Sequence, residues 1–166
     1  DLSATESERV QGETGLYLTT VEPTKTEFGF APPTKNRSFM GRPIGWPGIE
    51  CSAGLGTHAP TMFEYEVPEG ASRFETWVGI SSDANNCRRA SAMVVFQDGH
   101  ARKLYETKVM RAAMPPEKVS FELSHVSSLR IEITDGGDGK DCDHVNFCDP
   151  RFIVFQEARL PHVRKK

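Results

Sequence analysis

Hydrophobic and polar residues alternate along several stretches of this chain of 166 residues. A period of two sends successive side chains to opposite faces, as in a β-strand that is buried on one face only. Antiparallel sheets commonly bury one face and leave the other in water. The pattern therefore predicts antiparallel strands at residues 61–67, 73–80, 119–123 and 129–133.

A fifth stretch, Ala92–Phe96, is apolar throughout, which predicts a strand near the centre of a sheet. Asp98-Gly99 follows it and precedes another strand-like run. Glycine tolerates the positive φ of a type I′ turn, so this pair predicts a two-residue hairpin.

No window of ten or more residues keeps a helical period of 3.6. About eight short strands separated by turns rich in Gly, Pro and Asn predict an all-β fold, a β-sandwich of antiparallel strands. Residues 29–60 are different, because they are rich in proline and glycine and alternate little. We expect a long ordered connection packed over the sandwich, and long loops of this kind often carry function.

The alternating region predicts a single domain over residues 15–157. Residues 1–14 are polar and predict a flexible lead-in, and residues 158–166 form a basic tail. The chain opens at Asp1 without a methionine, which favours a processed piece of a longer protein.

Composition excludes two kinds of partner. The formal net charge is −3, so no polybasic surface for nucleic acid is expected. No apolar run approaches the ~20 residues that cross a bilayer, so no membrane insertion is expected.

Four cysteines, Cys51, Cys87, Cys142 and Cys148, allow three pairings if all are bridged. Their places in polar loops favour an oxidising compartment, although free thiols are equally compatible with the sequence.

Residues 134–149 form a loop dense in polar groups between two hydrophobic strands. Calcium prefers six to eight oxygen ligands, which Asp135, Asp138, Asp141 and Asp143 could help to supply. A structural calcium ion and a solvated turn are therefore both open. Cys142 and Cys148, with His144 between them, are also compatible with zinc or with a local disulfide.

Signals for catalysis are weak. The common motifs for nucleophilic serine, zinc hydrolysis and phosphate binding are missing. Paired carboxylates such as glycosidases use exist in the loop at 134–149, but on such a turn they are usually solvated. We expect no enzyme, with a hydrolase fragment as the weaker alternative.

Several residues outside strands could bind a ligand. Trp46 lies in the long connection, where its face could stack on a sugar ring or plug one end of the sandwich. His58 could face a ligand hydroxyl or stabilise a turn. The loop at 81–89 offers Asn85, Asn86 and Arg88, whose amide and guanidinium groups suit vicinal hydroxyls, although a polar surface loop is the simpler interpretation.

Taken in order, several motifs resemble one family, the NPCBM domain, which is also classed as carbohydrate-binding module family 51. The resemblance is collinear over roughly residues 15–156. The motifs are Gly54–Pro60, Ser72–Ile80, Val94–Tyr105, Val109–Arg111, Leu129–Gly139 and Asp143-His144.

The resemblance implies a galactose-binding-like jelly-roll β-sandwich without catalysis, part of a larger extracellular or periplasmic glycan-active protein. Relatives bind galactose-type glycans, and some carry structural calcium, which here implies Asp135, Asp138 and Asp143. The chain departs from the family where a tryptophan often follows Asp-His, since it has Val145-Asn146-Phe147.

We therefore predict a glycan-binding module with a shallow site in loops at one end of the sandwich. A protein–protein or interdomain docking module on the same fold is the alternative. The predicted ligand-binding residues are Trp46 for stacking, with His58, Asn85, Asn86, Arg88, His144 and Asn146 for hydroxyls.

Overall fold

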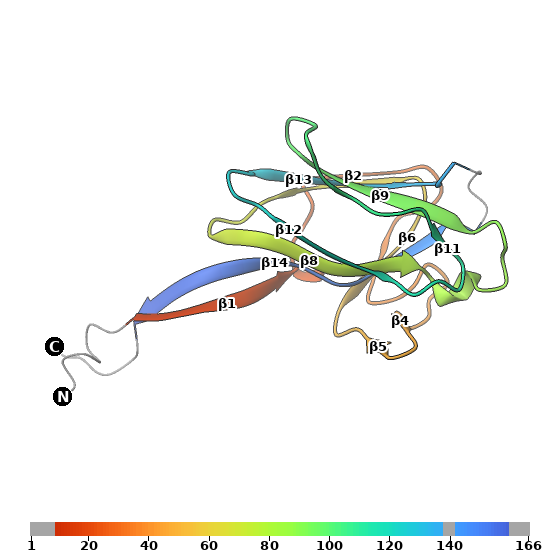
Figure 1. Cartoon of the computed structure of the whole chain (residues 1–166), viewed down its shortest axis with the longest axis horizontal. Helices are drawn as coiled ribbons and strands as arrows, with labels where there is room; N and C mark the ends of the chain where they lie inside the picture. Colours follow the sequence, from red (N-terminus) through yellow and green to blue (C-terminus); the bar gives the residue numbers. More distant parts are fainter. Residues whose placement is uncertain (1–8, 138–141, 160–166) are drawn as a thin grey trace.

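The computed structural model describes residues 9–137 and 142–159. These residues form two stacked antiparallel sheets of six strands each, together with a small two-stranded hairpin (Figure 1). The fold class predicted from the sequence, an all-β sandwich, is confirmed.

The first sheet has the order β12-β8-β14-β6-β3, and β1 also pairs with β14. Its strands are β1 (Arg9–Tyr17), β3 (Thr34–Lys35), β6 (Gly54–His58), β8 (Ala71–Ile80), β12 (Glu117–Glu122) and β14 (His144–Arg159).

The second sheet has the order β10-β9-β13-β7-β2, and β11 also pairs with β9. Its strands are β2 (Lys25–Phe28), β7 (Thr61–Glu66), β9 (Ser91–Asp98), β10 (Lys103–Glu106), β11 (Met110–Arg111) and β13 (Ser128–Thr134). The remaining elements are the hairpin β4 (Gly45–Trp46) and β5 (Ile49–Glu50) and the single 3-10 turns η1 (Leu18–Thr20) and η2 (Ser82–Ala84).

The core lies between the two sheets and is built from the alternating positions. In β13, Leu129, Ile131 and Ile133 are buried, whereas the residues between them face outward. Phe74 of β8 meets Phe96 of β9 with ring centroids 5.8 Å apart. Burial of each such side chain stabilises the fold by roughly 1.5–3 kcal/mol. The alternation thus sorted the inner and outer faces correctly.

A shaped turn in which His58 bonds a backbone group was one of two interpretations of Gly54–Pro60. The imidazole does bond the carbonyl of Ala59, but Gly54–His58 is not a turn. The segment is β6, a strand between β14 and β3. All five of its residues are buried, because the chain before it covers the outer face of the sheet, so no alternation marks the strand. A Cβ atom on Gly56 would lie 2.3 Å from the carbonyl oxygen of Arg37, so only glycine allows this close approach.

The hairpin between β9 and β10 exists, but its connection is longer than two residues. The N–H of Asp98 donates to the carbonyl of Arg102 at 2.9 Å. The Asp98 carboxylate accepts the N–H groups of His100 and Arg102, and Ala101 adopts the positive φ that was expected of Gly99. The side chain of Asp98 therefore organises this turn.

β1 and β14 form a long two-stranded ribbon that extends beyond the sandwich (Figure 1). β1 begins at Arg9, within the segment 1–14 predicted to be flexible, because β14 continues far enough to pair with it. Residues 1–8 and 160–166 lie outside the described residues.

Within the described part of the chain, no helix is long and apolar enough to cross a bilayer.

Candidate functional site

Two disulfide bonds fix the loops at one end of the sandwich. Cys51 is bonded to Cys148, and Cys87 is bonded to Cys142. The alternatives of free thiols, a local Cys142–Cys148 bond and zinc held by these cysteines are therefore wrong. The partners lie far apart in sequence and meet only because β14 runs beside β6 and β8.

The loop that contains η2 connects β8 to β9 and is held from three sides. The Ser81 hydroxyl accepts the N–H of Asp83 and so caps the turn. The Ser81 N–H donates to the carbonyl of His144 at 2.8 Å, and the Ser38 hydroxyl donates to the Asp83 carboxylate. Cys87 anchors the far end of the loop through its disulfide.

His58 and His144 lie on neighbouring strands on one side of this loop. They are register partners in β6 and β14, and their ring centroids are 5.0 Å apart. Phe30 stacks on His58 at 4.4 Å with an interplanar angle of 19°, and Phe39 contacts both imidazoles at 5.1 and 4.8 Å. We call these four residues the histidine–phenylalanine cluster.

The two histidines differ in their environment. His58 is only 5% exposed, and its Nδ1–H donates to the carbonyl of Ala59 at 2.7 Å. His144 is half-buried, and burial lowers its pKa; the nearby His58 lowers it further, whereas Asp83 opposes the shift. The Nδ1 atom of His144 has no hydrogen-bond partner among the described residues.

Asn146 follows on the same face of β14 and is 1% exposed. Its register partners on the two neighbouring strands are both glycines, Gly56 and Gly79, which leaves room for its side chain. Because His58 and Asn146 are both buried, a surface ligand does not reach them in this conformation. His58 and Asn146 therefore lie beneath the surface at which a ligand would bind, whereas Phe30 is 63% exposed.

The sequence pattern did not identify Phe30 and Phe39 as site residues, because both lie in the long connection. Their only signal is that large apolar residues occur there without alternation.

A groove lies on the other side of the η2 loop. The β4–β5 hairpin lies outside the first sheet, on the side away from the second (Figure 1). The indole N–H of Trp46 donates to the carbonyl of Ile80 at 2.9 Å, which fixes the ring with 8% of the residue exposed. The groove has a volume of about 310 Å³, and we call it the Trp46 groove. Its lining includes Trp46, Ser82, Asn85, Met114, Pro115 and Pro116.

The predicted ligand-binding residues therefore separate into three places. Trp46 and Asn85 meet in the Trp46 groove. His58, His144 and Asn146 lie on the outer face of β6 and β14. Asn86 and Arg88 are exposed on the η2 loop and do not line this groove.

Gly79 of β8 explains how the walls of the groove come together. A Cβ atom at this position would lie 3.0 Å from the Cα of Pro116 and 3.2 Å from Cζ2 of Trp46. The absence of a side chain therefore allows both walls to pack on β8.

The predicted metal ligands are described only in part, because Asp138 lies outside the described residues. The Asp143 carboxylate is buried and accepts the N–H of Ser91 at 2.9 Å. The Asp135 carboxylate accepts the N–H of Gly137, which closes a tight turn. Within the described ranges, no three His, Cys, Asp or Glu residues are arranged to hold a metal. Calcium at this loop stays a prediction, which titration with Ca²⁺ can test.

Three solved structures from Clostridium perfringens show the same fold. The CBM51 module of GH95 in complex with methyl-galactose is 26% identical, with a TM-score of 0.76, over 84% of this chain and 99% of that one. The CBM51-2 and INT domains of ZmpB, with CBM51-2 in complex with GlcNAc, give 22% identity and a TM-score of 0.77 over 87% and 32%. The structure of the M60 catalytic domain of ZmpB with its two CBM51 domains is 22% identical, with a TM-score of 0.78. The match covers 87% of this chain and 15% of that one.

The sandwich is therefore of the class found in family 51 carbohydrate-binding modules. The chain belongs to the NPCBM/NEW2 domain family, whose model matches residues 14–153. It spans only 15% of the ZmpB chain that contains the M60 domain. A search of curated proteins finds no match.

Proposed function

We propose that this chain is a non-catalytic module that binds glycans in the Trp46 groove. The observation that carries the proposal is the meeting of Trp46 and Asn85 in one open groove at the loop end of the sandwich. Membership in the NPCBM/NEW2 family supports it. The groove volume, about 310 Å³, falls at the lower end of the range for small-molecule sites.

The chemistry of the lining suits a sugar. Met114, the three prolines of the lining and the small exposed part of Trp46 offer apolar surface to the C–H face of a pyranose ring. The Asn85 amide offers two donors and one acceptor for hydroxyl groups, and its side chain is exposed. Trp46 is fixed by its hydrogen bond to Ile80, so little ordering is needed on binding.

The absence of catalysis is supported by the composition of the groove. Glycosidases use two carboxyl groups that flank the scissile bond. Among the described residues, no Asp or Glu lines the Trp46 groove. Turnover of a galactoside by the isolated chain would overturn this part of the proposal.

We propose galactose-type glycans as the ligand class, because the relative that is 26% identical was solved with methyl-galactose. GlcNAc belongs in the same test, since CBM51-2 of ZmpB was solved with it. The two disulfides support an extracellular or periplasmic location. The ZmpB structure supports a parent protein with a neighbouring catalytic domain.

Isothermal titration with methyl galactosides and GlcNAc tests the proposal. We expect Trp46→Ala and Asn85→Ala to weaken binding at least about tenfold, which corresponds to about 1.4 kcal/mol. Asn86→Ala is the matched control, because Asn86 lies on the same loop outside the groove. Unchanged affinity in folded Trp46→Ala protein would rule out this groove.

Docking of a protein or neighbouring domain is the second candidate function. It is favoured by three exposed apolar side chains in the segment 28–40, namely Phe28, Phe30 and Met40, which are 48%, 63% and 57% exposed. Apolar surface of this kind marks interaction sites when it is contiguous. Failure of every glycan tested, together with binding to an adjacent domain of the parent protein that Phe30→Ser abolishes, would favour docking over glycan binding.

A further inference from the structure

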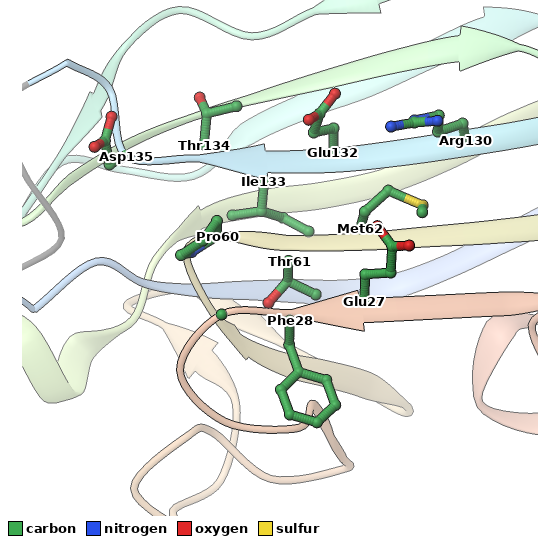
Figure 2. A pocket seen from close by; sticks show the side chains of 11 residues that line it. Glu27, Phe28, Pro60, Thr61, Met62, Arg130, Glu132, Ile133, Thr134 and Asp135 are labelled. Carbon is green, nitrogen blue, oxygen red and sulfur yellow. The ribbon is translucent and has the colours of Figure 1, made fainter.

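The outer face of the second sheet contains a groove that is separate from the Trp46 groove (Figure 2). It crosses β2, β7 and β13 and has a volume of about 500 Å³. We call it the β13 groove. Its lining includes Glu27, Pro60, Met62, Arg130, Glu132 and Asp135.

The register of the sheet places two carboxylates on either side of Met62. Glu27 of β2 and Glu132 of β13 are both Cα partners of Met62 in β7. All three side chains therefore share one face, as Figure 2 shows, and Met62 is only 5% exposed. Neighbouring strands lie about 4.8 Å apart, so β2 and β13 are separated by roughly 10 Å. This spacing leaves room for one small ligand group above Met62.

The polar groups of the groove are mostly hydrogen-bond acceptors. The carboxylate of Glu132 has no hydrogen bond or ion pair with any described residue. The hydroxyl of Thr134 already donates to the carbonyl of Met93 at 2.8 Å, so only its lone pairs remain. One oxygen of the Asp135 carboxylate accepts the N–H of Gly137, and the other accepts no hydrogen bond from a described residue.

Arg130 is the one cation among the described residues that line the groove. Its Nη1 lies 3.6 Å from the Glu64 carboxylate, which offsets its charge, and its buried Nε has no hydrogen-bond partner among the described residues. Glu27 has a neighbouring cation in Lys25, at 3.4 Å, but the side chains of both residues are largely exposed, so the pair is weak. The groove therefore has acidic character, because the three carboxylates of Glu27, Glu132 and Asp135 outnumber the guanidinium group of Arg130.

The floor and one end are apolar. Met62 and Pro60 line the groove, and Phe28 at its edge is 48% exposed. Such surface packs against the C–H face of a sugar ring, while oxygen atoms at the rim accept its donors.

We propose that the β13 groove binds a saccharide that carries a free amino group. An ammonium group has three donors and no acceptor, which matches a rim of accepting oxygens. Glu27 and Glu132 hold the ammonium group from two sides, and the exposed Pro60 contacts the ring. Acidic sugars are excluded by like charge. The site is independent of the Trp46 groove, which lies outside the other sheet.

The test is NMR titration of the ¹⁵N-labelled full chain with methyl 2-amino-2-deoxy-glucoside. We expect shifts at Glu27, Met62 and Glu132, and an affinity at least about tenfold higher than for the N-acetylated glucoside, which lacks the charge. Glu132→Gln and Glu27→Gln keep the size of the side chain and should each weaken binding about fivefold. Glu122→Gln, an exposed residue of the first sheet, is the matched control.

Equal binding of the N-acetylated sugar would overturn the proposal, as would the absence of shifts at the three residues. Equal or tighter binding of Nα-acetyl-lysine amide would replace the sugar by a basic peptide and also overturn it. Trp46→Ala should leave this titration unchanged, so failure of the Trp46 groove and failure of the β13 groove can be told apart.

The affinity for the amino sugar should fall as ionic strength rises from about 0.02 to about 0.5 M, because salt screens the exposed carboxylates.

Discussion

The imidazole rings of His58 and His144 face each other across β6 and β14, with centroids 5.0 Å apart. Phe30 and Phe39 cover the pair, so the rings are partly removed from water. Two histidines this close cannot both become charged without repulsion, and burial already lowers the pKa of His144.

Stability should therefore depend on pH through His144. Its pKa in the folded chain is below the value of about 6.5 in the unfolded chain, so the unfolded chain binds the proton more tightly. The free energy of unfolding should be fully present above about pH 6.5 and should fall as the pH drops below that value. Urea unfolding between about pH 7.5 and about pH 5 measures this dependence.

His144→Gln should flatten that pH dependence, because glutamine does not titrate. His100→Gln is the control, since His100 is exposed in the hairpin after β9. An identical pH dependence in the wild type and in His144→Gln would show that the pair does not cause it.

Trp46→Phe isolates the hydrogen bond from the apolar surface of the ring. The buried carbonyl of Ile80 loses the donor that now lies 2.9 Å away, whereas most of the aromatic area is kept. We expect a loss of about 1–2 kcal/mol in the free energy of unfolding. Chemical denaturation measures it, and a loss below about 0.3 kcal/mol would mean that water replaces the indole N–H at no cost.

Gly79→Ala should narrow the Trp46 groove from its floor. The new methyl group would press on Pro116 and Trp46 at 3.0 and 3.2 Å, so both walls must move by a few tenths of an ångström. We expect a destabilisation of about 1–3 kcal/mol and weaker galactoside binding. Gly12→Ala is the control, because nothing lies within 4 Å of its added Cβ. Retention of full affinity in Gly79→Ala would place the ligand elsewhere.

Removal of either disulfide should destabilise the chain by a similar amount. Cys51–Cys148 spans 97 residues and Cys87–Cys142 spans 55. Loss of a native bridge typically costs about 2–5 kcal/mol. The logarithmic dependence on loop length makes the longer bridge only about 0.5 kcal/mol more stabilising. Paired Cys→Ser variants and urea unfolding measure both.

The two bridges should differ in their effect on binding. Cys87–Cys142 anchors the loop that carries Asn85, so its removal should weaken galactoside binding beyond its effect on folding. Cys51–Cys148 constrains the chain after the β4–β5 hairpin, outside the η2 loop, so its removal should have the smaller effect on affinity. The reverse order would show that the η2 loop is held without its disulfide.

Sequence by itself was enough to predict the β-sandwich and most of its inner and outer faces. In β13, Leu129, Ile131 and Ile133 face the core as their period of two predicts, because this period follows from the geometry of one strand. β6 was not predicted, because no such alternation marks it. It is covered on both faces, so burial leaves no alternation, and its strand character comes from neighbours distant in sequence.

The candidate site divides in the same way. Residue chemistry selected Trp46, Asn85, His58 and His144 as residues of interest. Only the tertiary structure decided that Trp46 and Asn85 share a groove, that His58 and His144 form a buried pair, and that Cys87 bonds to Cys142. A local pattern records which face of a strand is buried. Strand order and the packing of long connections decide which distant residues meet, and neither is encoded in a local period.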